Sequence, residues 1–147
     1  ELDLSFIEEM PLGEIHGRNT TYISSEETRE LLSQRFELIP STESSGGPAR
    51  YWRIPGSESR IGFISPHSHN FCDTCNRVRI TAKGELYPCL GQNDAMHLLP
   101  ILREFPGDEA PLRQAIIDSM GIKPFGHDFT QQMDSPQVVR FMSMTGG

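Results

Sequence analysis

All three cysteines of the chain lie in one short stretch. Two residues separate Cys72 from Cys75, and thirteen separate Cys75 from Cys89. Two thiolates at the first spacing can reach one metal ion or cluster from a tight turn. Cys89 can join them only if the chain folds back. The pattern therefore predicts a three-cysteine site that is completed by a hairpin.

The residues between the cysteines predict that hairpin. They alternate as two strands do, around a three-residue loop that ends at Gly84 in the left-handed conformation. This register sets Cys89 opposite Arg77. Residues i and i+2 of a strand share a face and lie roughly 6.5 to 7 Å apart, so Arg77 and Arg79 are expected to point together. Their guanidinium groups match the geometry of phosphate or carboxylate, which favours an anionic ligand.

The spacing alone leaves the identity of the metal open. A structural zinc site takes four protein ligands, whereas three cysteines leave one position for substrate or water. His67 or His69, just upstream, could supply the fourth ligand of a Cys3His zinc-stabilised binding module. An iron-sulfur cluster and unliganded buried thiols are the other two interpretations.

A longer set of residues around the cysteines resembles one enzyme family. Its members are Ile61-Gly62-Phe63-Ile64-Ser65-Pro66, Phe71-Cys72-x-x-Cys75-Asn76-Arg77-x-Arg79, Gly84, Cys89-Leu90, Phe6-Ile7-Glu8, Met10 and Met144-Thr145-Gly146-Gly147. This set resembles the C-terminal portion of molybdenum cofactor biosynthesis protein A (MoaA), the radical SAM GTP 3',8-cyclase family. The resemblance covers the whole chain. The Arg-x-Arg after the second cysteine and the terminal glycines argue against a different radical SAM enzyme with an auxiliary cluster.

The resemblance implies roles for particular residues. The three cysteines are implied to hold a second 4Fe-4S cluster, with one iron left for the guanine of GTP. Substrate binding is implied for Arg77, Val78 and Arg79. Met10 is implied to contact S-adenosylmethionine, and it follows the first strand together with Glu8 and Glu9, where a parallel barrel builds its active site.

The end of the chain receives a role from the same resemblance. Gly146 and Gly147 are implied to be catalytic residues, since a tail without side chains can thread into the active-site cavity. A sulfur-carrier tail also ends in two glycines, but the upstream chain lacks the small half-barrel pattern of that class. Family members often carry Arg where this chain has Ser5, so the substrate contact linked to that Arg is not carried over.

The expected fold is α+β: the C-terminal part of an incomplete (β/α) radical SAM barrel plus a small antiparallel sheet that carries the second cluster site. Residues 1–40 are expected to form the last barrel strand and helix, and residues 41–147 the cluster-binding and substrate-binding region with the Gly-Gly tail. The Cys-x3-Cys-x2-Cys loop of radical SAM enzymes does not occur in the sequence. The chain is therefore interpreted as a fragment that binds cluster and GTP but needs an N-terminal barrel for turnover; a homodimer of the full-length enzyme is left open.

Local patterns predict the individual elements. Alternation and periodicity favour strands over residues 2–7, 49–54 and 60–65 and helices over residues 25–35, 96–104 and 108–120. The apolar stripe of the last helix, Leu112, Ile116, Ile117 and Met120, is expected to be core. Trp52 is expected to pack against apolar neighbours. The neighbouring His127 and Asp128 receive no catalytic role, because no nucleophile is placed beside them.

Composition narrows the functional classes. The net charge is −7, from 20 acidic and 13 basic residues, which argues against a nucleic-acid or membrane-surface binder. The 13 glycines and 11 prolines indicate a loop-rich chain. No apolar run approaches the length of a membrane span, and an odd cysteine count favours a reducing, cytoplasmic setting. An anionic substrate such as GTP would need local positive charge.

Overall fold

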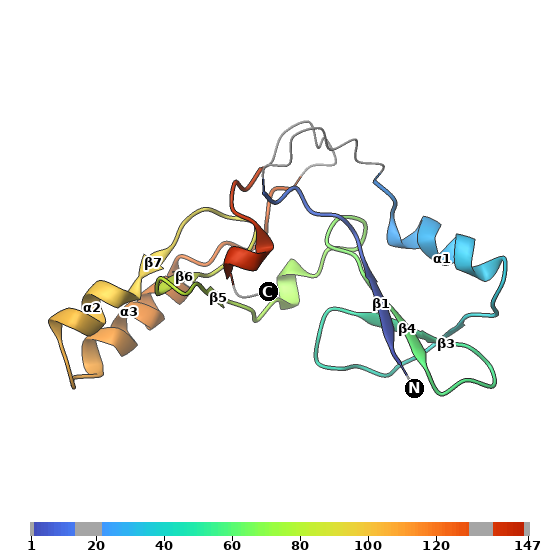
Figure 1. Ribbon diagram of the computed structural model, residues 1–147, viewed down its shortest axis with the longest axis horizontal. Coiled ribbons are helices and arrows are strands. Elements are labelled where there is room, and N and C mark those ends of the chain that lie inside the picture. Colours follow the sequence, from blue (N-terminus) through green and yellow to red (C-terminus); the bar gives the residue numbers. More distant parts are fainter. Residues whose placement is uncertain (1, 14–21, 130–136, 146–147) are drawn as a thin grey trace. The chain divides into compact units, whose positions relative to one another are not determined.

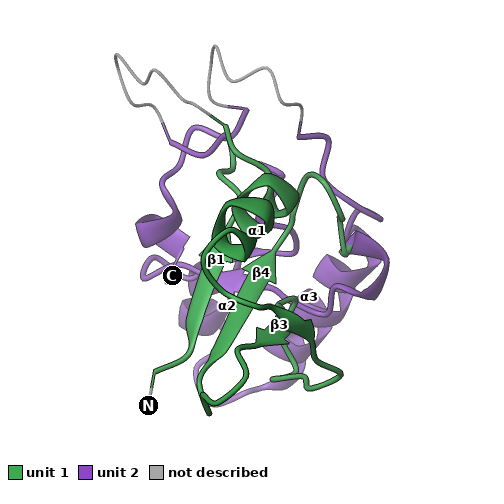
Figure 2. Cartoon of the chain, turned by 90° about the vertical axis from the view of Figure 1, so that its right-hand side faces the viewer, with its two compact units in different colours: residues 1–10, 19–71 green, residues 11–18, 72–147 purple. Residues whose placement is uncertain are grey.

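The computed structural model describes residues 2–13, 22–129 and 137–145. These residues form two β-sheets and three α-helices (Figure 1), which confirms the α+β class. The chain divides into two compact units, unit 1 with residues 1–10 and 19–71 and unit 2 with residues 11–18 and 72–147 (Figure 2). Each unit contains one of the sheets. In the described ranges, no helix has the length and apolar character that a membrane crossing requires.

Unit 1 is built on a four-stranded sheet. Its order is β1 (Leu4–Ile7), β4 (Arg60–Ile64), β3 (Arg50–Arg53) and β2 (Ile39–Pro40). β1 runs parallel to β4, whereas β4–β3 and β3–β2 are antiparallel. The strands predicted over residues 2–7, 49–54 and 60–65 are thereby confirmed.

Aromatic side chains pack across the centre of this sheet. Phe63 of β4 is buried, and the ring of Phe6 stacks on it with 5.8 Å between centroids. Trp52 meets Phe63 edge to face at 5.1 Å. Offset and edge-to-face pairs of this kind add to the burial of apolar area. The packing role predicted for Trp52 is confirmed.

β1 is an edge strand with apolar side chains in solvent. Leu4 is 55% exposed, and Leu2 and Ile7 are also exposed. Only β4 pairs with β1 among the described residues. The alternating pattern predicts a strand with one buried face, but the exposed apolar side chains of β1 are not covered by other described residues. Apolar side chains on both faces are typical of a strand that belongs inside a larger parallel sheet.

Helix α1 (Ser25–Ser33) begins at the predicted capping box. The Ser24 hydroxyl accepts a bond from the Glu27 backbone N–H at 3.1 Å, and the Glu27 carboxylate accepts one from the Ser24 N–H at 2.8 Å. These bonds satisfy donors that the first helical turn leaves open. The first turn also meets the end of β4, where the Ser65 hydroxyl donates to the Ser25 hydroxyl at 2.8 Å.

Unit 2 combines a three-stranded antiparallel sheet with a helical hairpin. The strands are β5 (Arg79–Ile80), β6 (Glu85–Tyr87) and β7 (Met96–His97), and the helices are α2 (Leu98–Glu104) and α3 (Ala110–Gly121), which lie side by side in Figure 1. Leu86, Leu98 and Ala115 form the buried core, with Met96, Ile101 and Leu112 packed against it.

The helix predicted over residues 96–104 begins later than expected. Met96 pairs with Leu86 as part of β7, so the helix starts only at Leu98. Pro100 lies in the first turn, where a helix does not need the backbone N–H that proline lacks. Proline therefore does not interrupt α2.

The prediction that the Leu112, Ile116, Ile117 and Met120 stripe is core is wrong for three of its members. Leu112 packs on the core, but Ile117 is 56% exposed, and Ile116 and Met120 are also exposed. The buried positions of α3 are instead Ala115 and Ser119. Small residues let the helix approach its neighbours closely, and the Ser119 hydroxyl is satisfied by the Ile116 carbonyl at 2.7 Å.

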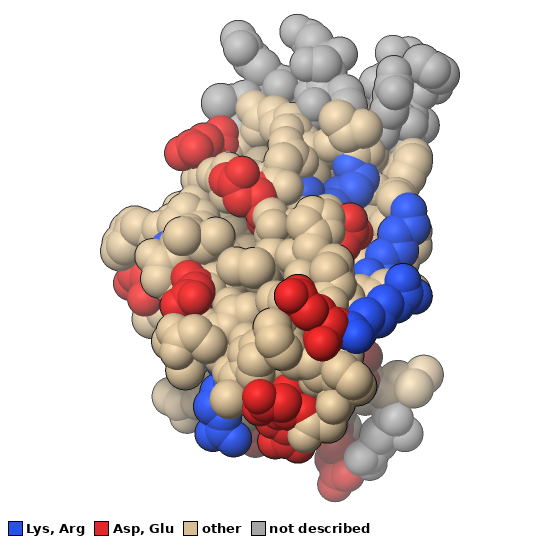
Figure 3. All heavy atoms as spheres, turned by 90° about the vertical axis from the view of Figure 1, so that its left-hand side faces the viewer, with Lys and Arg blue, Asp and Glu red and all other residues tan. Residues whose placement is uncertain are grey.

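Charge on the surface is mixed. On the face shown in Figure 3, acidic side chains are dispersed among uncharged ones, and most lysine and arginine side chains lie along one edge of the view. Positive charge on this face is therefore local, as expected for a chain with a net charge of −7.

Candidate functional site

The first two cysteines lie on a tight turn, as predicted. Cys72 begins the 3-10 helix η1 (Cys72–Thr74), and the Cys75 N–H donates to the Cys72 carbonyl at 3.2 Å. All three cysteines are partly exposed. Within the described residues, no group of three or more His, Cys, Asp or Glu side chains is arranged around a point that could hold a metal ion.

The pKa of Cys89 is influenced by the two other thiols. Burial raises the pKa of Cys89, and the charges of Cys72 and Cys75 raise it further. The Gly91 backbone N–H and the Lys123 charge act in the opposite direction. A bound metal cation offsets the repulsion between neighbouring thiolates, because its positive charge stabilises the deprotonated form of each cysteine. By their chemistry, three cysteine thiolates are a donor set that fits an iron-sulfur cluster.

The predicted hairpin between the cysteines is confirmed. β5 and β6 pair Arg79 with Tyr87 and Ile80 with Leu86. Gly84 has φ of 75°, and its N–H donates to the Thr81 carbonyl at 2.9 Å. The ladder ends at Arg79 and Tyr87, so the pairing of Arg77 with Cys89, which the same register predicts, lies beyond the strand ends and stays a prediction.

The Arg-x-Arg segment alternates in exposure. Val78 and Ile80 are exposed, whereas Arg77 and Arg79 are half-buried. This alternation matches a strand whose two arginines share one face. Lys123 lies nearby in space, and its Nζ donates to the Arg77 carbonyl at 2.6 Å. Lys123 thus fixes the backbone two residues before β5 begins.

Two glycines allow other segments to pass close to the cysteines. A Cβ at Gly126 would lie 3.2 Å from the Cys72 Cβ and 3.4 Å from its Sγ. A Cβ at Gly91, two residues after Cys89, would lie 2.4 Å from the Cβ of His127. The His127 ring stacks on Phe129 at 4.2 Å. These contacts give His127 a packing role against the Cys89 loop.

Replacing Gly91 by Ala should destabilise unit 2. The new methyl group would overlap the Cβ of His127, and overpacking of this kind costs about 1 to 3 kcal/mol. Thermal unfolding followed by circular dichroism should show a lower Tm. Gly121→Ala is the matched control, because nothing lies within 4 Å of its Cβ and alanine favours a helix. Equal Tm values for Gly91→Ala and wild type would contradict the packing described here.

Glu8 lies immediately after β1 and is 3% exposed. Its carboxylate accepts backbone N–H bonds from Ser25 at 2.9 Å, His67 at 2.9 Å and Ser68 at 3.0 Å, and a bond from the Ser68 hydroxyl. Burial alone would raise the pKa of Glu8, but these hydrogen bonds outweigh burial and lower it to about 2. Glu8 is therefore a charged structural acceptor that ties β1, α1 and the loop after β4 together.

The other predicted positions of unit 1 have separate environments. The His67 ring Nε2 lies 2.9 Å from the Glu9 carbonyl, and His69 is exposed. Met10 is half-buried, three residues beyond the end of β1. Ser5 pairs in register with Gly62 of β4. In unit 2, the predicted catalytic residues Gly146 and Gly147 lie outside the described residues.

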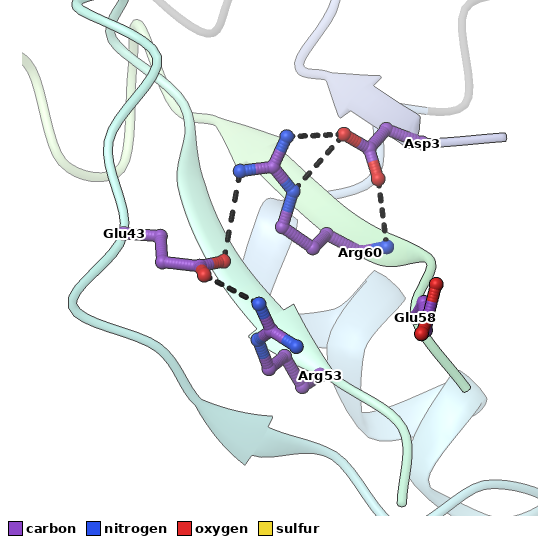
Figure 4. A pocket seen from close by; sticks show the side chains of 5 residues that line it. All are labelled: Asp3, Glu43, Arg53, Glu58 and Arg60. Carbon is purple, nitrogen blue, oxygen red and sulfur yellow. Dashed lines mark hydrogen bonds and ion pairs between the residues drawn. The ribbon is translucent and has the colours of Figure 1, made fainter. Parts of the chain in front are cut away.

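One hollow of unit 1 is lined by charged residues, most of which pair with one another. It has a volume of about 550 Å³, and its lining residues are Asp3, Glu43, Arg53, Glu58 and Arg60 (Figure 4). The Arg60 guanidinium donates to the Asp3 carboxylate and lies 3.6 Å from the Glu43 carboxylate. The Glu43 carboxylate also pairs with Arg53. Hydrogen bonds from Arg60 hold the pKa of Asp3 below its usual value. Because both guanidinium groups already face carboxylates, the hollow is a poor site for a triphosphate.

A smaller hollow of about 170 Å³ lies at the first turn of α1. It is lined by Ser25, Glu26, Arg29, Arg50, Trp52, Phe63, Ser65 and His69. The Arg29 guanidinium lies over the Trp52 ring at 5.9 Å and pairs with Glu26. None of the cysteines or the Arg-x-Arg residues lines either hollow.

Comparison with known proteins gives consistent matches over the whole chain. The family described as Molybdenum Cofactor Synthesis C matches residues 2–129. GTP 3',8-cyclase of Saccharophagus degradans is 55% identical over 148 residues, which are 99% of this chain and 44% of that protein. The enzymes of the same name from Ectopseudomonas mendocina and Pseudomonas savastanoi pv. phaseolicola are 53% and 56% identical, over 44% and 45% of their lengths. The chain thus spans less than half the length of these relatives.

Proposed function

Because this chain belongs to the Molybdenum Cofactor Synthesis C family, we propose that it is the C-terminal part of a GTP 3',8-cyclase. The resemblance predicted from the cysteine motif is confirmed by relatives of that name. The complete protein would convert GTP to 3',8-cyclo-7,8-dihydro-GTP in molybdenum cofactor biosynthesis. This portion would bind a cluster and the substrate, and the N-terminal portion would supply the radical SAM barrel with its S-adenosylmethionine.

Unit 2 would contribute the site for the second cluster. Cys72, Cys75 and Cys89 would hold a 4Fe-4S cluster whose remaining iron is open to a donor atom of the guanine. The observation that carries this proposal is the register of the β5–β6 hairpin. Both Arg77 and Cys89 lie just beyond the open end of this hairpin. Arg77 and Arg79 on one strand face would then bind the anionic part of the nucleotide, with the Val78 backbone between them.

Fixing the nucleotide before reaction is the physical contribution we assign to these residues. An intramolecular ring closure requires the ribose and the base to meet in one orientation. The residues would hold the base at one end of the nucleotide and the charged groups at the other. Binding would then restrict the orientation of the nucleotide before the reaction, so that less entropy is lost in the ring-closing step. The two arginines also offset negative charge in a protein that is acidic overall.

Unit 1 would complete the barrel. Its parallel β1–β4 pair and the exposed apolar side chains of β1 support a position beside further strands of a longer protein. We assign residues 1–40 to the last barrel strand and helix and residues 41–147 to the cluster and substrate region. Met10 would contact S-adenosylmethionine, and Gly146 and Gly147 would enter the active site.

Metal and sulfide analysis of the anaerobically prepared complete protein tests this proposal. We expect two iron-sulfur clusters per chain, acid-labile sulfide in equal amount to iron, and a broad visible absorption. A colourless protein with one zinc per chain at these cysteines would instead support the Cys3His binding module and overturn the proposal.

Removal of either guanidinium group should weaken GTP binding. A charge-assisted hydrogen bond contributes about 1.5 to 3 kcal/mol, so Arg77→Ala and Arg79→Ala should each raise the Kd for GTP by about 10- to 100-fold. Isothermal titration into cluster-loaded complete protein measures this change. Arg103→Ala, an exposed arginine of α2, is the matched control. Unchanged affinity in both variants would remove these residues from the substrate site.

A further inference from the structure

Arg140 reaches across to the loop that carries Cys89. We call residues 87–93 the Cys89 loop and residues 137–145 the C-terminal segment. The Arg140 guanidinium donates to the Leu90 carbonyl at 3.0 Å, to the Gln92 carbonyl, and to the Asn93 side-chain oxygen at 3.1 Å. It also lies over the ring of Tyr87 with 3.8 Å to the centroid. One side chain therefore contacts the loop both before and after Cys89.

The segment that carries Arg140 is itself firmly anchored. Val138 and Thr145 are each 1% exposed, on either side of Arg140. The Val138 backbone bridges to Leu12, and the Thr145 hydroxyl donates to the Met142 carbonyl at 2.8 Å within the short helix η2 (Met142–Thr145). A long side chain loses much freedom when it is ordered. The fixed backbone at Val138 reduces the part of this cost that comes from the main chain.

The guanidinium is held where it is partly desolvated. Burial lowers the pKa of Arg140 from its usual value, yet an arginine keeps its charge in proteins. Its Nε is buried and has no hydrogen-bond partner within the described residues. A buried donor without a partner is unfavourable, so the bonds to the loop and the Tyr87 ring must offset it. Such an arrangement is expected where the Cys89 loop must be held in one position.

We propose that Arg140 is a positioning residue for Cys89, and that it couples the C-terminal segment to the third cluster ligand. Cys72 and Cys75 lie on their own turn, whereas Cys89 sits on a loop whose carbonyls Arg140 binds. Loss of Arg140 should therefore release Cys89 selectively. The inference rests on the proposed function for its consequence, because a loosened Cys89 would hold the second cluster less tightly.

Thiol alkylation in the cluster-free complete protein tests the contact itself. The probe is iodoacetamide under native, anaerobic conditions, with each cysteine followed by peptide mass spectrometry. In Arg140→Gln, alkylation of Cys89 should become about tenfold faster, since local opening no longer has to break these bonds. Cys72 and Cys75 should change less than about twofold. Arg113→Gln, an exposed arginine of α3, is the control and should leave all three rates unchanged.

The outcomes separate this inference from the proposed function. Equal acceleration at all three cysteines would indicate general unfolding and would overturn a selective role, as would unchanged alkylation of Cys89. Arg140→Lys keeps the charge but cannot span three acceptors, so its Cys89 rate should lie between those of wild type and Arg140→Gln. After reconstitution, Arg140→Gln should lose second-cluster iron to a chelator faster than wild type. Absence of that cluster in wild type would contradict the proposed function alone, because the alkylation result needs no cluster.

Discussion

Cys89→Ser should remove the second cluster from the complete protein and with it the binding of GTP to iron. Serine keeps the size of the side chain but does not supply the thiolate that iron-sulfur clusters require. Because the two expected clusters contain equal amounts of iron, iron and sulfide per chain should fall to roughly half. The change that GTP causes in the electron paramagnetic resonance spectrum of the reduced protein should disappear.

Histidine variants provide the decisive control for this result. Under the cluster assignment, His67→Ala and His69→Ala should keep the full iron and sulfide content, since neither ring is a ligand. In a Cys3His zinc site, one of them would lose metal as completely as Cys89→Ser does. Cys72→Ser and Cys75→Ser should reproduce the effect of Cys89→Ser. A Cys89→Ser protein that retains all of its iron and its response to GTP would refute the assignment of this ligand.

Features set by neighbouring residues could be predicted from the sequence. The hairpin register follows from a three-residue loop that ends in a glycine with φ of 75°, because the loop length determines which residues pair. The capping box at Ser24 and Glu27 is likewise local. The hairpin that follows the second cysteine and the turn that carries the first two cysteines could therefore be assigned from local patterns alone.

Contacts between distant residues could not be predicted in this way. Lys123 bonds a carbonyl 46 residues away and Arg140 one 50 residues away, and no periodicity in the sequence indicates either partner. The same limit explains α3, because the pattern shows that the helix is amphipathic but does not show that it packs through Ala115 and Ser119. Side chains that hold the Cys89 loop therefore become visible only in the structure.

The role of Glu8 also could not be predicted from local patterns, because it depends on donors from two segments that are distant from it in the sequence. The sequence pattern places it after a strand, among candidates for the active site. In the structure its carboxylate is surrounded by the N–H groups of Ser25, His67 and Ser68. A charged acceptor in that position satisfies donors at the start of α1 and in the loop after β4 at the same time.

Glu8→Gln should therefore cause a large loss of stability in unit 1. The folded pKa of Glu8 is about 2, against an ordinary value of 4.5, and this difference corresponds to about 3 kcal/mol of stabilisation at neutral pH. Glutamine removes the charge and turns an N–H₂ group toward backbone donors. Urea unfolding followed by the fluorescence of Trp52, the single Trp of the chain, should show a loss of this size. Glu30→Gln, on the exposed surface of α1, should not change it.

The pH dependence of this loss identifies its cause. Since the folded pKa is lowered, the stabilisation is complete above pH 4.5 and declines as the pH falls through the folded value of about 2. Wild type and Glu8→Gln should therefore differ most near neutral pH and converge toward pH 2, because protonation removes from the wild type the same charge that the substitution removes. A difference that stayed constant from pH 7 to pH 2 would mean that the substitution acts through shape and packing, and the carboxylate charge would then have no part in holding β1 to α1.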